Sequence, residues 1–358
     1  MECNRNSGKR SSSGKEIKIK RRSCDCRNFS VCVLTVRQVS TFCMDYELYH
    51  DESKVEGYWH AILLVPVAKK QALLQLLSQA RQNTNYIEPL GIKKIKKYNR
   101  IYDCADSWVQ IAVAALMSRT KTQPYPISLG SNTRGQKQYS LFKIVVGAKF
   151  ILFKNRDNLE EMIGHSDYGS KVETTFRIGL KGGLHLLGDQ PEGIHITRMH
   201  FDGHAHYHRH LSRNRIIERL TGLRDYCSIS TADDVIDDRT GNHKKTECQE
   251  YDDCQILQLT DLLIGCFRTV LTPVTKTKEI HRKLAQPIKK IVDRYQQGSA
   301  RMWNSRWRNS FCMSQCYLES GSWKFDEIEC IKAQEGQQLS MELNDALAIN
   351  SYINSRPV

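Results

Sequence analysis

The stretch from residue 44 to residue 67 constrains the fold more than any other part of the sequence. Residues 44–53 read Met-Asp-Tyr-Glu-Leu-Tyr-His-Asp-Glu-Ser, a short strand pattern that ends in acids. Residues 57–67 then form an apolar run, which is typical of a strand buried on both faces of a sheet. A short polar turn separates the two segments, so we expect an antiparallel hairpin at the centre of a sheet.

Helical and extended patterns alternate after this hairpin. Apolar residues recur at helical spacing in six segments, 68–82, 102–118, 172–187, 211–223, 255–271 and 276–296. Strand patterns occupy 140–153 with a break at Gly147, 193–201 and 226–231, whereas 123–138 reads as a loop. A hairpin followed by alternating helices and strands predicts an α/β fold in which helices flank one mixed sheet.

Three regions follow from the composition along the chain. Residues 1–43 begin with a basic stretch rich in Ser, Gly and Asn, and we predict a largely disordered N-terminal extension. Residues 44–297 carry the alternating pattern and form the predicted domain. Residues 298–358, rich in Trp, Arg, Asn and Ser, are assigned to a C-terminal extension.

Hydrophobic residues make up 40% of the 358 residues and charged residues 26%, which is ordinary for a soluble globular protein. The longest apolar runs are too short to span a membrane, so we expect a cytoplasmic protein without a membrane partner. The 13 cysteines are an odd number, which argues against complete disulfide pairing. Cys254 and Cys266 lie in apolar helical surroundings, and we expect buried free thiols there.

The net charge of +14 favours a polyanionic partner, and nucleic acid, either DNA or RNA, is the first expectation. The charge is uneven along the chain. Residues 1–30 hold nine lysines or arginines against three acids, so this stretch contributes +6 of the total.

Three carboxylates stand where a rigid element meets a loop. Asp51 ends the first strand, Asp202 follows the strand at 193–201, and Asp261 lies on the helix at 255–271. Carboxylates that converge need a cation, and Mg²⁺ or Mn²⁺ suits hard oxygen ligands and bridges substrate phosphates. Acids also follow strands simply because loops begin there. From this pattern alone, each of the three could instead be an ordinary solvated residue at the start of a loop. Asp252 or Asp253 could also reach the site.

Two short motifs add a resemblance. Asp51-Glu52-Ser53 after a strand, and Gln258-Leu-Thr-Asp261-Leu-Leu-Ile-Gly265 on a late helix, resemble the two motifs of the family named domain of unknown function 3800. The resemblance spans Met44 to Arg268 and implies a ribonuclease-H-like fold. It further implies a site with one Asp from the first strand, one from a central strand end and one from a late helix. Asp51, Asp202 and Asp261 match these places; Lys54 departs from the family pattern, where Gly usually follows.

Two polar residues accompany these acids. In a regular strand the side chain of Glu52 faces away from that of Asp51, so Glu52 is a ligand only if the strand ends or bends there. Gln258 shares a helix face with Asp261 and either positions a water or a phosphate, or forms a hydrogen bond in the core.

Five histidines surround Asp202 in the sequence: His200, His204, His206, His208 and His210. They favour either a transition-metal site, a polar loop that faces water or phosphate, or a general acid at His204. The leading prediction is a metal-dependent nuclease that hydrolyses phosphodiester bonds through the Asp cluster. The alternatives are a catalytically inactive nucleic-acid-binding protein on the same fold and a zinc hydrolase built on the histidines.

Overall fold

The computed structural model describes residues 44–54, 57–117, 125–131, 137–142, 147–156, 168–187, 193–202, 227–229, 236–238, 251–272, 278–296, 310–320 and 322–328. The chain divides into two units, Met1–Ser40 and Thr41–Val358, and every described residue belongs to the second. The predicted N-terminal extension and the predicted helix at 211–223 therefore lie outside the described residues.

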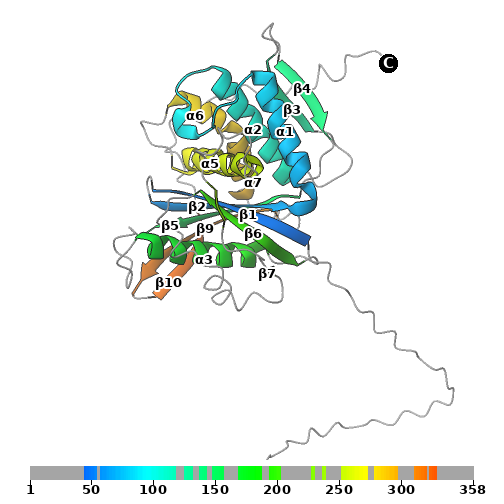
Figure 1. Ribbon diagram of the computed structural model, residues 1–358. Helices are drawn as coiled ribbons and strands as arrows, with labels where there is room; N and C mark the ends of the chain where they lie inside the picture. The colour runs from blue at the N-terminus through cyan, green and yellow to red at the C-terminus, as the bar shows by residue number, and fades with distance from the viewer. Residues whose placement is uncertain are drawn as a thin grey trace, which may run out of the picture. The chain divides into compact units, whose positions relative to one another are not determined.

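An eight-stranded mixed sheet forms the centre of the second unit (Figure 1). Its order is β10-β9-β5-β2-β1-β6-β7, and β8 also pairs with β6. The strands are β1 (Met44–Ser53), β2 (Tyr58–Pro66), β5 (Lys149–Asn155), β6 (Ile194–Asp202), β7 (Cys227–Ile229), β8 (Ile236–Asp238), β9 (Phe311–Glu319) and β10 (Ser322–Glu327). β1 and β2 are antiparallel, as are β2 and β5, whereas β6 runs parallel to β1 and β9 runs parallel to β5.

The predicted hairpin is present and central. β1 pairs with β2 from Tyr46↔Pro66 to Ser53↔Trp59 without a register shift. Every residue of β2 is buried. The continuous apolar run in the sequence therefore reflects a strand that is covered on both faces.

Helices cover both faces of the sheet (Figure 1). One face carries α3 (Tyr168–Leu187), and its core contains Leu48, Phe176 and Phe201. The opposite face carries the larger core, to which Tyr49, Trp108 and Phe267 belong. The helices on this side are α1 (Lys70–Thr84), α2 (Arg100–Met117), α5 (Tyr251–Leu271), α6 (Glu279–Leu284) and α7 (Gln286–Gln296).

Helix α5 packs across β1 and β2 and is buried along most of its length. It is also the one helix, within the part of the chain that the structure describes, that is long and apolar enough to cross a membrane. Its apolar window is 78% buried inside the fold, so its composition agrees with the role of a core helix that is apolar on all sides. Cys254 and Cys266 on this helix are buried free thiols, as predicted.

Three sequence expectations differ from the structure. Residues 125–131 form strand β3 (Tyr125–Ser131), which pairs with β4 (Lys137–Phe142) in a separate two-stranded sheet, where a loop was expected. The helix expected at 276–296 is divided into α6 and α7, because Pro287 suits the first turn of a new helix and not the interior of a long one. The sheet also continues past residue 297, the limit predicted for the domain, because β9 and β10 complete one edge.

Candidate functional site

The alternation of side chains along β1 decides which polar groups meet α5. Tyr49 belongs to the core beneath α5, whereas Leu48 belongs to the core beneath α3. Side chains two apart share a face, so Glu47, Tyr49 and Asp51 all face α5. Strand β6 lies beside β1 and contributes His200 and Asp202 from alternate positions in the same way.

Asp51, Asp202 and Asp261 form one group, the strand-end carboxylates. Asp51 lies near the end of β1, Asp202 is the last residue of β6, and Asp261 lies in the middle of α5. Burial raises the pKa of Asp51, and the neighbouring charges of Asp261 and Asp202 raise it further. Asp202 and Asp261 thus lie close enough to Asp51 to oppose its ionisation.

Asp261 is held in place by a segment that crosses over it. Burial raises its pKa, while the backbone N–H of Ile92, the charge of Lys93 and the carboxyl group of Asp51 act in the opposite direction. The Ile92 N–H donates to Asp261 Oδ2 at 3.2 Å. Gly91 allows this approach, because a Cβ at that position would lie 3.1 Å from Asp261 Oδ2.

Within the described residues, no lysine or arginine forms an ion pair with Asp51 or Asp261. The nearest cations, Lys93 and Arg268, act on Asp261 from a distance. Arg268 instead donates to the hydroxyl of Ser53, just past the end of the acidic stretch. A buried pair of acids such as Asp51 and Asp261, without a paired lysine or arginine, is the kind of site that a divalent metal ion stabilises.

Gln258 is fully engaged by the protein. Its Oε1 accepts from the backbone N–H of Leu90 at 2.7 Å and from Arg81 Nη2 at 2.9 Å. Of the two roles left open by the sequence, these contacts match the hydrogen bond in the core. Gln258 fixes the segment that contacts Asp261, and so acts on the site through that segment.

Glu52 lies on the opposite face from Asp51, as the alternation predicted. Its carboxylate accepts a hydrogen bond from the hydroxyl of Tyr58, which belongs to the core beneath α3. Its backbone also contacts the site, since the Glu52 N–H donates to Asp51 Oδ1 at 2.7 Å. The contacts therefore tie the Glu52 carboxylate to the face of β1 opposite α5.

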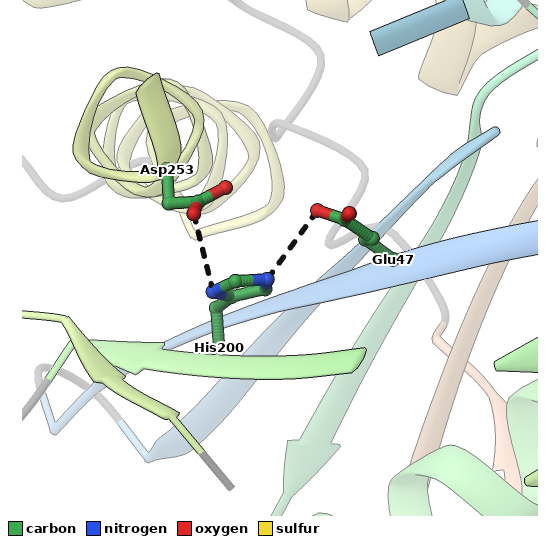
Figure 2. A group of neighbouring side chains, drawn as sticks. All are labelled: Glu47, His200 and Asp253. Atoms are coloured by element: carbon green, nitrogen blue, oxygen red, sulfur yellow. Dashed lines mark ion pairs between the residues drawn. The ribbon is translucent and has the colours of Figure 1, made fainter. Parts of the chain in front are cut away.

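A second polar group on the same side of the sheet was not predicted. We name Glu47, Tyr49, Lys70, His200 and Asp253 the lysine-bridged cluster. Figure 2 shows His200 between the carboxylates of Glu47 and Asp253. His200 Nε2 lies 3.4 Å from Glu47 Oε2, and His200 Nδ1 lies 3.9 Å from Asp253 Oδ2. Its ring stacks on that of Tyr49, with 4.6 Å between centroids.

Lys70 supplies the cation of this cluster. Its Nζ lies 2.6 Å from Glu47 Oε2 and 2.5 Å from Asp253 Oδ1. Burial acts to lower the pKa of Lys70, but its hydrogen bonds to both carboxylates outweigh burial, so the pKa is raised. For Glu47, burial acts to raise the pKa, but His200, Lys70 and Tyr49 together bring it far below its usual value.

The ligand atoms of Glu47, His200 and Asp253 lie within 4.8 Å of one another, so this group could hold a metal ion. The Tyr49 hydroxyl lies 2.6 Å from Glu47 Oε2 and 2.7 Å from Asp253 Oδ1, so it too occupies carboxylate oxygens that a metal ion would use. A metal ion would compete with the Lys70 ammonium for both carboxylates. The cluster is thus internally neutralised, in contrast to the strand-end carboxylates.

Comparisons of the chain with protein-family models, with curated proteins and with solved structures returned no match. The resemblance to the domain of unknown function 3800 therefore stays a prediction, and the functional argument rests on the residues themselves.

The described residues include only the start of the histidine-rich stretch. His200 is fully buried in β6 and does not belong to a solvated loop. His204, His206, His208 and His210 lie outside the described residues. The expectations of a zinc site or a general acid among them stay predictions.

The sequence contained a signal for the lysine-bridged cluster. Glu47 lies four residues before Asp51 on an alternating strand, and Asp253 lies eight residues before Asp261 on a helix. Glu47 shares a face of β1 with Asp51, and Asp253 lies on the same side of α5 as Asp261. If Asp51 meets Asp261, then Glu47 and Asp253 are expected to meet further along the same two elements. The position of Lys70, the first residue of α1, had no comparable signal.

Proposed function

We propose that this protein is a nuclease that hydrolyses phosphodiester bonds with Mg²⁺ or Mn²⁺ held by Asp51, Asp202 and Asp261. The observation that carries the proposal is that Asp202 on β6 and Asp261 on α5 both lie close enough to Asp51 on β1 to raise its pKa, with no lysine or arginine paired to Asp51 or Asp261 among the described residues. Carboxylate oxygens are the donors that both cations prefer. Such a cation activates a water and neutralises charge on the leaving oxygen.

The topology supports a ribonuclease-H-like interpretation of this site. The five strands β5-β2-β1-β6-β7 place the first strand in the middle, with β2 antiparallel to both of its neighbours. An acid on that first strand, an acid at the end of the adjacent parallel strand and an acid on a late helix are the places that the resemblance implies. We include this fold assignment in the proposal.

The residues of the chain have separate tasks in this proposal. Asp51 and Asp261 would hold the cation through their carboxylate oxygens. Gln258 and the Ile92 N–H hold the segment over Asp261 and keep its carboxylate oriented. Asp202, the last residue of β6, would complete the ligand set.

A cleavage assay tests the proposal. Labelled single- and double-stranded DNA and RNA are incubated with the full chain in Mg²⁺, Mn²⁺ or EDTA, alongside Asp51→Asn and Asp261→Asn. Asp252→Asn is the matched control, because Asp252 lies on α5 and is partly exposed in its first turn. We expect metal-dependent cleavage that falls by roughly 100-fold or more in both site variants and is unchanged in the control.

Retention of metal-dependent cleavage by both site variants would refute the role of these acids. Absence of cleavage under all conditions by a folded protein would leave the binding role as the better account.

A further inference from the structure

A positively charged surface lies next to the strand-end carboxylates. Two segments contribute to it, residues 93–100 and residues 278–283, which include most of α6, and we name it the basic ridge. Its exposed cations are Lys93, Lys94, Lys96, Lys97, Arg100, Lys278, Arg282 and Lys283. Among the described residues of these two segments, the one carboxylate is that of Glu279, which pairs with Lys283 at 3.2 Å. The ridge is therefore strongly positive.

The residues just before the first segment are fixed to α5 and α1. Leu90 donates its N–H to Gln258, and Ile92 donates its N–H to Asp261. Arg81 Nη1 donates to the carbonyl of Glu88 at 2.8 Å. Gly265 permits close packing, because a Cβ there would lie 2.6 Å from Ile92 Cδ1. Lys93 follows directly after this anchor, so the lysines begin beside Asp261 and extend away from it.

The second segment is joined to the first. His281 Nε2 donates to the carbonyl of Ile95 at 2.8 Å. The ammonium of Lys283 lies over the ring of Tyr98, 5.3 Å from its centroid. Tyr98 is 55% exposed, and its other contact is an edge-to-face packing with Tyr102 at 5.0 Å. An exposed aromatic ring is thus held among the cations of the ridge.

We propose that the basic ridge binds single-stranded nucleic acid and directs it to the strand-end carboxylates, with Tyr98 as a stacking platform for a base. This inference rests on the proposed function, since it names the substrate class for the same site. Lysines neutralise backbone phosphates of any sequence, and an exposed ring among them is the arrangement that stacks unpaired bases. A duplex keeps its bases stacked inside and makes no use of such a ring.

Fluorescence anisotropy with a labelled single strand and the matching duplex, in EDTA across a salt series, tests the ridge in the full chain. The ridge variant replaces Lys93, Lys94, Lys96 and Lys97 with Gln. The matched control replaces Lys69, Lys181, Lys290 and Lys324 with Gln, which removes the same charge from exposed positions elsewhere. The slope to compare is that of the logarithm of the binding constant against the logarithm of the salt concentration. Loss of four phosphate contacts should reduce this slope for the single strand by about 3, and the control should change it by less than about 1.

Tyr98 is tested separately. We expect Tyr98→Ala to weaken single-strand binding about 10-fold and Tyr98→Phe to retain it, since Phe keeps the ring. Duplex binding should change little in either variant.

Equal losses in the ridge variant and its control would assign binding to net charge alone and overturn the proposal, as would absence of nucleic-acid binding by the wild type. Because binding is measured in EDTA, the ridge and the nuclease site can fail separately. Loss of binding in the ridge variant without wild-type cleavage supports the ridge and refutes the nuclease. A ridge variant that binds nucleic acid as tightly as the wild type and cleaves it at the wild-type rate would refute the ridge and support the nuclease.

Discussion

The strand-end carboxylates and the lysine-bridged cluster both draw on β1, β6 and α5, but the lysine-bridged cluster adds a cation, Lys70, from α1. Each takes one acid from β1 and one from α5, and each has a group from β6 nearby. Lys70 contacts both carboxylates of the lysine-bridged cluster. Within the described residues, Asp51 and Asp261 have no such partner.

The electrostatic consequences are opposite in sign. The pKa of Glu47 lies far below its usual value, so this acid stays ionised and stabilises the fold except in strong acid. Burial and like charge raise the pKa of Asp51, so its ionisation destabilises the fold until a cation binds. The same sheet and helix thus hold one completed ion network and one acid pair, Asp51 and Asp261, that has no paired lysine or arginine among the described residues.

The largest effect is expected from removing Lys70. Lys70→Met leaves Glu47 and Asp253 buried without their cation, and we expect a loss of about 3–5 kcal/mol in the free energy of unfolding, measured by urea denaturation. Lys69→Met is the control. Lys69 is the exposed neighbour of Lys70, so its replacement should cost less than about 0.5 kcal/mol in the free energy of unfolding. Adding Glu47→Gln and Asp253→Asn should restore much of the loss. A cost below about 1 kcal/mol for Lys70→Met would show that the cluster does not depend on its lysine.

Lys70→Met also tests whether the lysine-bridged cluster can bind a metal ion once its own cation is removed. Without the ammonium, Glu47, His200 and Asp253 keep ligand atoms within 4.8 Å of one another. We expect Zn²⁺ to raise the melting temperature of Lys70→Met, because imidazole and carboxylate donors suit this ion. Further substitution of His200 by Phe should remove the zinc effect. A zinc response that persists without His200 would place the ion elsewhere.

The pH dependence of metal-free stability is expected to be smaller. The folded state retains a proton at Asp51 because its pKa is raised, while the unfolded state releases it above its ordinary pKa. Stability should therefore rise as the pH falls from about 7 to 5, by at most about 1.4 kcal/mol per pH unit relative to Asp51→Asn. Thermal melts of both proteins in EDTA across this range measure the difference. Parallel curves for the two proteins would contradict the raised pKa.

The smallest effect concerns the segment over Asp261. Gly91→Ala places a Cβ 3.1 Å from Asp261 Oδ2, so the carboxylate or the segment must shift by a few tenths of an ångström. We expect about 10-fold slower cleavage with a stability change within about 1 kcal/mol. Gly182→Ala in α3 is the control, since nothing lies within 4 Å of its Cβ, and it should leave cleavage unchanged. Equal cleavage by both variants would show that the position of Asp261 tolerates this shift.

The sequence predicted the elements whose signals are local. The hairpin, α1, α2, α3 and α5 follow from periodicity within each segment. β9 was missed because its partner β5 lies about 160 residues earlier, and no local pattern records that pairing. Pro287 divided a helix whose apolar spacing continued across it.

The candidate site followed the same rule. Asp51 and Asp261 could be named because strand ends and a resembling motif mark them, and their proximity is visible in the fold. Their catalytic role stays a prediction. The acids of the lysine-bridged cluster had a signal in their spacing, but the position of Lys70 could not be derived, because it needs the first residue of α1 to reach between β1 and α5.

Metal-induced stabilisation tests the difference between the two clusters most directly. Melting temperatures of wild type, Asp51→Asn and Asp253→Asn are compared in EDTA and in saturating Mn²⁺, each against its own metal-free value. The account predicts a rise of roughly 5 °C or more for the wild type and for Asp253→Asn, and no rise for Asp51→Asn. A rise that persists in Asp51→Asn and disappears in Asp253→Asn would place the metal ion in the lysine-bridged cluster and contradict the account.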